Sequence, residues 1–341
     1  MQTLLPFHTF HLPAFAQAVV PVQNVEQLLT EFRHTQEAQQ PLLFLGQGSN
    51  LLFIEDFAGT VLINQMKGVA YRQDDHYHYL HISGGESWHE LVKWTLTQDI
   101  AGLENLALIP GCVGSAPIQN IGAYGMEFEQ ACEFVEVLSL NSGEIFRLSR
   151  DECQFGYRES IFKHQYKNGY VIISVGLKLP KQWEPILSYG SLINLDPKTV
   201  TPRQIFEEVC AIRSQKLPNP DEWGNAGSFF KNPVIDSAKF LQLQTAYPQL
   251  PYYLQSNGSV KIPAGWLIDQ CQLKGFQVGG AAVHTQQALV LINKGNATGE
   301  DVVALAKKVR HSVREKFDID IHPEVRFIGK FGEIDSEVAT R

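Results

Sequence analysis

The sequence predicts a mixed protein of the α+β or α/β class, organised in two or three lobes. Three observations support this prediction. The chain has 341 residues, which exceeds the length that one hydrophobic core usually organises. Four segments combine an N-terminal capping pattern with apolar residues at helical spacing. Between them, short runs rich in β-branched and aromatic residues alternate with glycine and proline turns, a pattern typical of strands.

Each of the four predicted helices starts with a polar capping pair and continues with an apolar face. The capping pairs are Asn24 with Gln27, Ser87 with Glu90, Thr201 with Gln204, and Thr298 with Asp301. Pro202 fits the first helical position, where a missing N–H group is tolerated. The apolar residues after each pair recur at helical spacing, so each helix is expected to bury one face.

The strand predictions rest on apolar runs of strand length. The runs are 42–45, 61–63, 134–140, 171–179, 288–292 and 325–328. The sequence shows no internal repeat. The segment 217–227, which contains proline and glycine, is the predicted boundary between lobes.

The composition argues against several classes of protein. A formal net charge of -8 disfavours nucleic-acid binding, because such proteins use Lys and Arg to displace counterions from phosphates. An anionic ligand would therefore need a local cationic pocket. No apolar run reaches the roughly 18 to 20 residues of a membrane helix. The first 18 residues lack a basic region and contain prolines and histidines, so we interpret them as mature protein.

The cysteine and histidine patterns predict neither disulfides nor a metal site. The cysteines are Cys112, Cys132, Cys153, Cys210 and Cys271, an odd number without a C-x-x-C motif. This pattern fits a reducing cytoplasm, so we expect a cytoplasmic protein. In the histidine-rich segment, strand alternation places His76 and His78 on one face and His81 on the other. Neither face therefore has enough imidazole ligands for a metal site.

The motif GQGSN follows the first predicted strand. Gly46 and Gly48 allow the backbone to approach a ligand closely, and Ser49 and Asn50 add side-chain donors for diphosphate oxygens. The motif is not a dinucleotide fingerprint, because Leu51 occupies the position of the third glycine. Taken alone, it is more typical of a tight turn that binds nothing.

A second glycine-rich stretch, PGCVGSAPIQNIGAYG, covers residues 110–125. Its glycines are Gly111, Gly114, Gly122 and Gly125, and its polar side chains include Ser115, Gln119 and Asn120. The glycines free the backbone for close contact, and the polar groups could bind an isoalloxazine edge or a diphosphate. In a purely structural role, so many glycines would destabilise the adjacent elements with no benefit, and this favours a ligand-binding loop.

The motif FGYRESIFK places Arg158 directly after Tyr157 in a loop between strand-like segments. A guanidinium stays charged at any working pH and can hold both oxygens of a carboxylate. Arg158 is therefore a candidate for binding a substrate carboxylate. The alternative is a surface arginine paired with Glu152 or Glu159.

The motif GNAGSFFKNP sets Ser228 between Gly227 and two phenylalanines. It is not a hydrolase elbow, because the positions two residues away from the serine are Ala226 and Phe230 rather than glycines. A hydroxyl beside apolar rings could donate a proton in a dry pocket. The alternative is a serine that caps a turn.

The motif HPEVRF begins a late strand. Alternation places Glu324 and Arg326 on the same face. The functional interpretation is an acid–base carboxyl group whose properties depend on its surroundings, and the alternative is an exposed ion pair that contributes little.

Six motifs in one order resemble the UDP-N-acetylenolpyruvoylglucosamine reductases, from near residue 10 to the C-terminus. They are GQGSN, PGCVGSAPIQNIGAYG, GYRESIFK, GNAGSFFKNP, AGWLIDQCQLKGFQVGGAAVHTQQALVLIN and PEVRFIG. The resemblance implies an α+β fold, with a two-lobed FAD-binding module of the vanillyl-alcohol-oxidase/PCMH type and a smaller α+β substrate-binding domain. The implied boundaries are 1–66 and 67–217 for the two lobes, 218–330 for the substrate domain and 331–341 for a tail.

The resemblance also implies an activity. NADPH and non-covalently bound FAD would reduce UDP-N-acetylglucosamine enolpyruvate to UDP-N-acetylmuramate in peptidoglycan synthesis, with hydride passing from flavin N5 to the enolpyruvyl carbon. The enzyme is expected to be a cytoplasmic monomer that needs no metal, nucleic acid or membrane. Rival interpretations are a flavin oxidase of the same fold acting on another sugar or alcohol, and a catalytically silent flavin sensor.

Site residues follow from the same resemblance, motif by motif. Arg158 would hold the substrate carboxylate, Ser228 would give the proton, and Glu324 would assist the enolic intermediate. The implied FAD contacts are Gly46, Gly48, Ser49, Asn50, Gly111, Ser115, Gln119, Gly122 and Tyr124. The implied substrate contacts are Tyr157, Tyr189, Arg213, Lys216, Asn232, Tyr253, Lys274, Gln287 and Arg326. The segment 183–192, with Tyr189, resembles the loop of the longer subtype, which closes over the nucleotide sugar.

Overall fold

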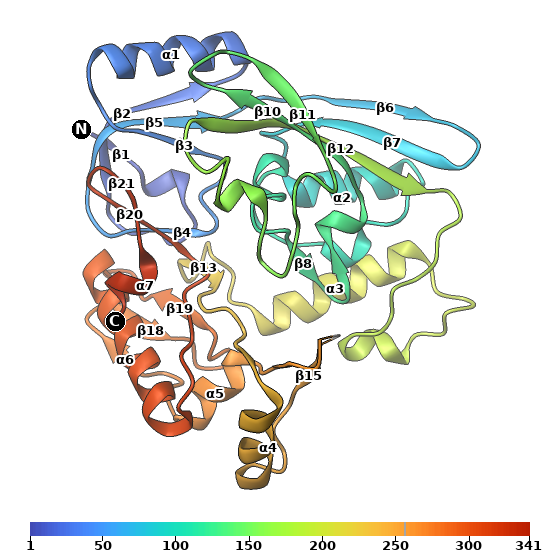
Figure 1. Cartoon of the computed structure of the whole chain (residues 1–341), viewed down its shortest axis with the longest axis vertical. Coiled ribbons are helices and arrows are strands. Elements are labelled where there is room, and N and C mark those ends of the chain that lie inside the picture. Colours follow the sequence, from blue (N-terminus) through green and yellow to red (C-terminus); the bar gives the residue numbers. More distant parts are fainter. Residues whose placement is uncertain (256) are drawn as a thin grey trace. The chain divides into compact units, whose positions relative to one another are not determined.

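The computed structural model describes residues 1–255 and 257–341, which divide into two compact units (Figure 1). Unit 1 comprises Met1–Gln17, Ser49–Ala58 and Lys216–Arg341. Unit 2 comprises Ala18–Gly48 and Gly59–Gln215. Unit 1 is thus assembled from three separate stretches of chain. The predicted lobe boundaries stay predictions.

The main sheet of unit 2 has five antiparallel strands in the order β11-β10-β12-β7-β6. The strands are β6 (Val69–Gln73), β7 (Tyr77–Ser83), β10 (Cys132–Ser139), β11 (Ile145–Ser149) and β12 (Tyr170–Pro180). Alternation along β7 buries Leu80 and Ile82 and leaves His81 on the other face. β6 and β7 form a long hairpin, cyan in Figure 1.

A second sheet has the order β1-β2-β5-β3, in which β3 and β5 are parallel. Its strands are β1 (Gln2–Thr3), which belongs to unit 1, β2 (Phe15–Val22) and β5 (Phe57–Asn64), which begin in unit 1 and continue in unit 2, and β3 (Leu42–Leu45) of unit 2. The remaining elements of unit 2 are α1 (Val25–Glu37), α2 (Trp88–Thr97), α3 (Pro202–Lys216), the hairpin β8 (Gly122–Ala123) and β9 (Met126–Glu127), and the short helices η2 (Glu104–Leu106), η3 (Val113–Ser115), η4 (Phe128–Gln130), η5 (Ile161–Lys163) and η6 (Gly190–Asn194).

Unit 1 contains three small sheets with the orders β13-β19-β18-β17, β14-β16-β15 and β21-β20-β4. Its strands are β4 (Leu51–Phe53), β13 (Asn225–Ser228), β14 (Val234–Ile235), β15 (Tyr253–Leu254), β16 (Val260–Lys261), β17 (Gln277–Val278), β18 (Ala281–Val283), β19 (Val290–Asn293), β20 (Arg326–Gly329) and β21 (Gly332–Ile334). Its helices are η1 (Leu5–Phe7), α4 (Ser237–Ala246), α5 (Ala264–Gln270), α6 (Gly299–Phe317) and α7 (Ser336–Ala339).

All four predicted helices are confirmed, as α1, α2, α3 and α6. The capping box of α6 forms in both directions between Thr298 and Asp301. The predicted cap at Ser87 is wrong, since its side chain makes no capping hydrogen bond in the structure. The six predicted strands are present with shifts of a few residues at their ends. Among the described residues, no helix combines the length and apolar character needed to cross a membrane.

Helix α6 organises the core of unit 1. One of its faces buries Val302, Leu305, Val309 and Val313 completely. This face packs against β17, β18 and α5, and the helix ends where Asp318 takes a left-handed conformation with φ of 51°. Burial of this apolar stripe, rather than helix propensity, stabilises the helix.

His8 is a buried polar residue in the same unit, with an exposed fraction of 2%. Its Nε2 lies 3.2 Å from the carbonyl oxygen of Leu12, and its ring packs edge-on against Phe53. Burial lowers the pKa of His8 from 6.5 to about 4. The folded protein therefore keeps His8 neutral where the unfolded chain protonates it.

We expect the stability of the protein to fall as the pH drops from 6.5 towards about 4. In this range the unfolded chain binds a proton at His8 and the folded protein does not, which removes up to about 3 kcal/mol of unfolding free energy. His8→Gln should lessen this slope, and His34→Gln, at an exposed histidine of α1, should not. Urea unfolding followed by circular dichroism at both ends of the range measures the slopes. If the unfolding free energy falls equally with pH in His8→Gln and wild type, His8 is not the cause of the loss.

Candidate active site

The two glycine-rich loops meet in unit 2. A side chain at Gly46 would place its Cβ 2.2 Å from the Sγ of Cys112, so only glycine fits there. The Gln47 side-chain oxygen accepts a hydrogen bond of 3.1 Å from the Gly111 backbone. Gly48 has a φ of 60°, which glycine adopts without strain. The two loops, predicted separately from the sequence, thus form one glycine-lined structure.

The second loop packs by its backbone on the end of β7. The Gly114 N–H donates to the carbonyl of Gly84 at 2.8 Å, and a Cβ at Gly114 would lie 3.0 Å from the Gly84 Cα. The Ser115 hydroxyl donates to the Cys112 carbonyl at 2.7 Å. Ser115 therefore caps its own turn, and its contact with FAD stays a prediction.

Asn120 is fully buried and uses its side chain inside the protein. Its amide nitrogen donates to the Glu127 carboxylate at 3.0 Å and to the Gly156 carbonyl at 3.1 Å. Its amide oxygen accepts from the Glu129 backbone at 3.0 Å. The suggestion that Asn120 contacts a flavin is therefore wrong for this conformation. Asn120 instead joins the second loop to the turn that carries Arg158.

Arg158 combines an unusual backbone with a defined side-chain position. Its φ of 55° is left-handed, a conformation that costs a non-glycine residue about 1 kcal/mol or more and that is found often at functional sites. Its Nη2 donates to the Gly122 carbonyl at 3.1 Å, and its guanidinium lies 5.5 Å from the Tyr157 ring. The Lys163 ammonium donates to the Arg158 carbonyl at 2.6 Å, which holds the turn.

Arg213, on α3, is close enough to Arg158 for their positive charges to repel each other. Burial lowers the pKa of Arg213, and repulsion from Arg158 adds to this shift. The Arg213 Nε donates to the Leu108 carbonyl at 3.3 Å. Burial also raises the pKa of Tyr124, which therefore keeps its proton at neutral pH. Two guanidinium groups that repel each other in a partly desolvated region favour the binding of an anion nearby.

The predicted Tyr189 loop is attached near Tyr124. The Asn105 side-chain amide donates to the carbonyls of Tyr124 and Ile186, both at 2.9 Å. The Tyr189 ring meets the Tyr124 ring edge-to-face at 5.8 Å and remains 41% exposed. The loop therefore has a fixed base and an accessible aromatic side chain.

Ser228 ends β13 in unit 1. Its backbone pairs with Val290 of β19. Gly227, just before it, has a φ of 72° and open space where a Cβ would be. The Asn225 side-chain oxygen accepts from the Gly227 N–H at 2.8 Å, which fixes this turn. Ser228 thus sits on a defined backbone, directly after a glycine with open space on its Cβ side.

Glu324 lies beside the residues that follow Ser228. The Glu324 N–H donates to the Phe229 carbonyl at 2.8 Å, and the Lys231 N–H donates to the His322 carbonyl at 2.9 Å. These bonds run antiparallel, so the two motifs adjoin although they are almost a hundred residues apart in sequence. The structure therefore places the segment that follows Ser228 next to the segment that carries Glu324.

Asn50 connects the first glycine-rich motif to Glu324. Its side-chain amide donates to the Glu324 carbonyl at 3.3 Å, and its own carbonyl accepts from the Arg326 N–H at 3.2 Å. Arg326 holds the Glu333 carboxylate with two nitrogens, at 2.8 Å and 2.7 Å. Any substrate contact of Arg326 would compete with this ion pair.

The other predicted substrate contacts of unit 1 have local partners or are exposed. They are Lys216, Asn232, Tyr253, Lys274 and Gln287. Asn232 accepts from the first N–H of α5, at Ala264, and Lys274 pairs with Asp269 at 3.0 Å. Within unit 2 lie Arg158, Arg213, Tyr157, Tyr189 and the FAD contacts predicted at 46–48 and 111–124, including Gln119. Ser49, Asn50, Ser228 and Glu324 belong to unit 1.

Sequence reasoning missed three residues that position these groups. Gln47 joins the two loops, Asn105 holds the Tyr189 segment, and Asn225 fixes the turn before Ser228. Each is a single amide residue whose partner is a backbone group. The only sequence signal was the position of Gln47 and Asn225 inside glycine-containing motifs.

Comparison with known proteins matches both parts of the chain. A family model described as "UDP-N-acetylenolpyruvoylglucosamine reductase, C-terminal domain" matches residues 219–328, and one described as "FAD binding domain" matches residues 16–149. The UDP-N-acetylenolpyruvoylglucosamine reductase of Haemophilus ducreyi is 65% identical over 339 residues, covering 99% of this chain and 98% of that protein. The Pasteurella multocida enzyme of the same name is 60% identical, covering 99% of each.

The similarity extends to the fold. The crystal structure of UDP-N-acetylenolpyruvylglucosamine reductase from Thermus caldophilus matches with a TM-score of 0.64 and 25% identity, covering 95% of this chain and 97% of that chain. With the FAD-binding match, it confirms the predicted α+β fold of an FAD-binding module and a smaller substrate domain. The chain therefore belongs to the UDP-N-acetylenolpyruvoylglucosamine reductases and is a flavin-dependent oxidoreductase of cell-wall synthesis.

Proposed function

We propose that the protein reduces UDP-N-acetylglucosamine enolpyruvate to UDP-N-acetylmuramate, with NADPH as the reductant and FAD as the carrier. NADPH gives up a hydride and becomes NADP⁺, and the enolpyruvyl double bond gains that hydride and one proton. The observation that supports this most is that two guanidinium groups lie at the second glycine-rich stretch, because Arg158 donates to the Gly122 carbonyl within it and Arg213 to the Leu108 carbonyl just before it. The pair would give an acidic protein the local positive charge that an anionic substrate requires.

The glycine-lined loops of unit 2 fit a flavin dinucleotide. Gly46 has no room for a side chain on the side of Cys112, and Gly114 packs backbone to backbone on Gly84, so the two loops lie close together at the end of β7. Backbone N–H groups in such loops suit a diphosphate. When bound, FAD supplies the hydride that adds to the terminal carbon of the enolpyruvyl group.

Arg158 would bind the substrate carboxylate. Hydride addition pushes electron density towards that carboxylate, so its negative charge grows during the reaction. A guanidinium that is permanently charged and fixed by Gly122 and by its own strained backbone stabilises this charge without reorganising. Arg158 should therefore bind the transition state more tightly than the ground state, which raises the rate.

Ser228 and Glu324 would complete the reduction. Ser228 would give its hydroxyl proton to the carbon next to the one that receives hydride, and a solvent proton would restore the hydroxyl. Glu324 would assist the enolic intermediate from the adjoining segment. The backbone hydrogen bond between Glu324 and Phe229 supports a joint role, because it holds both motifs in one register.

The wild-type protein, reduced by NADPH without oxygen, should regain its yellow colour when the enolpyruvyl UDP-sugar is added. Ser228→Ala should accept hydride from NADPH normally but reoxidise at least about 10²-fold more slowly, since a positioned acid contributes about that much. Stopped-flow absorbance separates the two half-reactions. Ser228→Cys tests a smaller change, and Ser237→Ala, at an exposed serine of unit 1, is the matched control.

Circular dichroism and flavin content must show that each variant is folded. If Ser228→Ala reoxidises as fast as wild type, the proton comes from Glu324 or water instead. If the wild type itself does not regain colour with the UDP-sugar, the proposed substrate is wrong.

We expect the purified protein to be yellow and to release one FAD on acid denaturation. The glycine-lined loops offer backbone contacts, and Cys112, the thiol next to Gly46, is only 4% exposed and faces the protein interior. Absorbance of the supernatant after precipitation measures the released flavin, and Cys112→Ser should behave like wild type. Flavin that stays with the precipitated wild-type chain but not with Cys112→Ser would show a covalent link.

Tyr189→Phe should weaken retention of the UDP-sugar several-fold and leave FAD affinity unchanged. The Tyr189 ring is partly exposed in a loop with a fixed base, so we expect its hydroxyl to contact the nucleotide sugar rather than the flavin. Titration of both ligands by fluorescence measures the two affinities. Tyr71→Phe, at a tyrosine of equal 41% exposure on β6, is the control. Equal losses for both ligands would mean that the loop is structural.

A further inference from the structure

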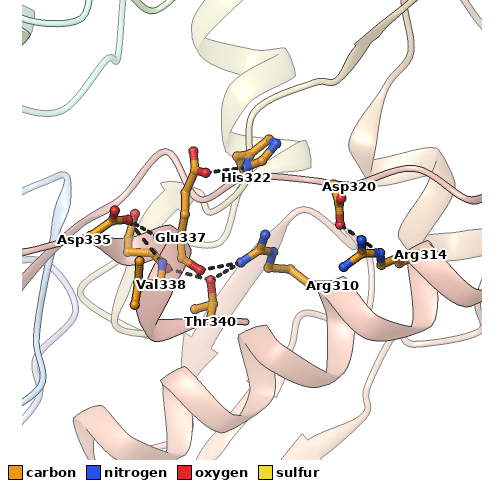
Figure 2. Close-up of polar contacts among 9 residues, drawn as sticks. Arg310, Arg314, Asp320, His322, Asp335, Glu337, Val338 and Thr340 are labelled. Atoms are coloured by element: carbon orange, nitrogen blue, oxygen red, sulfur yellow. Dashed lines mark hydrogen bonds and ion pairs between the residues drawn. The ribbon is translucent and has the colours of Figure 1, made fainter.

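The last residues of unit 1 form helix α7, which lies close to α6 (Figure 2). The Asp335 carboxylate caps this helix by accepting from the N–H groups of Glu337 and Val338 at 2.8 Å and 3.2 Å. A helix of four residues does not form by itself in water. Its position must therefore come from contacts with the rest of unit 1.

Arg310 of α6 supplies the main contact. Its side chain is buried, and its Nη1 donates to the Glu337 carbonyl at 2.9 Å and to the Thr340 hydroxyl at 2.7 Å. Thr340 is itself only 1% exposed. A buried guanidinium needs such polar partners, so Arg310 and α7 hold each other in place.

Glu337 also contacts the segment that leads to Glu324. Its Oε2 lies 3.1 Å from the Nδ1 of His322, as Figure 2 shows. This Nδ1 is shielded from water and makes no aligned hydrogen bond among the described residues, so its contact with the Glu337 carboxylate is electrostatic. Arg314 pairs with Asp320 at 3.5 Å nearer the start of the same segment.

The contact is close to the backbone that carries Glu324. The His322 carbonyl accepts from Lys231, and two residues later the Glu324 N–H donates to Phe229. His322 directly precedes Pro323, which pairs antiparallel with Phe230, and it follows a segment without regular structure. Fixing the His322 side chain therefore limits how far the segment with Glu324 can shift along the segment with Phe229 and Lys231.

We propose that Glu337 is a positioning residue, which holds His322 and through it the register of Glu324 beside the Ser228 motif. The proposal rests on the proposed function, since it concerns the placement of Glu324 in that reaction. The two side chains are 43% and 48% exposed, so solvent weakens their attraction. The effect on the rate should be about two- to five-fold rather than the much larger loss expected for a residue that touches substrate.

The test uses full-length, FAD-loaded protein with Glu337→Gln, His322→Gln and the double variant. Hydrogen–deuterium exchange should show faster exchange of the Lys231 and Glu324 amides in each variant. Flavin reoxidation by the UDP-sugar should slow about two- to five-fold while NADPH reduces the flavin normally. The double variant should lose no more than either single variant, because both remove one interaction.

Glu315→Gln is the matched control. It removes a His–Glu pair of the same 3.1 Å length, between His311 and Glu315 on α6, that does not lead to Glu324. Amide exchange and reoxidation should both match wild type in this variant. Equal effects of Glu315→Gln and Glu337→Gln, or wild-type amide exchange in Glu337→Gln, would overturn the proposal.

Glu324→Gln distinguishes this outcome from a failure of the proposed function. If Glu324→Gln reoxidises at the wild-type rate, Glu324 has no part in the reaction and the proposed function is wrong in that respect. If Glu324→Gln is slow while Glu337→Gln is normal in rate and amide exchange, only the positioning role is overturned.

Discussion

The absence of a side chain at Gly46 is the constraint on which the site in unit 2 depends. Because no Cβ separates it from Cys112, the first glycine-rich loop lies against the second, and Gln47 can reach Gly111. The second loop continues to Asn120, which binds the turn around Arg158. A larger residue at position 46 would therefore disturb the whole series of contacts, not only the loop that contains it.

The sequence predicted the larger elements well and the smaller ones poorly, for physical reasons. Helix α6 combines a two-way capping box with a long apolar stripe, so local and global preferences agree. Helix α4 has a cap at Asp236 but buries only Phe240 and Leu243, and α5 follows Pro263 without a side-chain cap. Such short helices are fixed by tertiary packing, which leaves little trace in the local sequence.

The site was predictable at the level of motifs but not of contacts. The residue types and the family resemblance singled out Arg158, Ser228 and Glu324. They did not predict the left-handed backbone of Arg158 or the internal use of Asn120, because both depend on partners distant in sequence. Likewise, strand alternation placed Arg326 on the face of Glu324, while its partner Glu333 comes from the next strand.

The division of unit 1 into separate stretches has a consequence for synthesis on the ribosome. Phe10 and Leu12 are completely buried in a core made mostly by residues after 216. At about 5 to 20 residues per second, synthesis of these later residues is complete roughly 15 to 65 s after Phe10 and Leu12 have been made. Unit 2, whose stretches end at Gln215, is complete earlier. While unit 2 can already fold, the apolar side chains of Phe10 and Leu12 have no core to enter, and exposed apolar segments of this kind are what a holding chaperone binds.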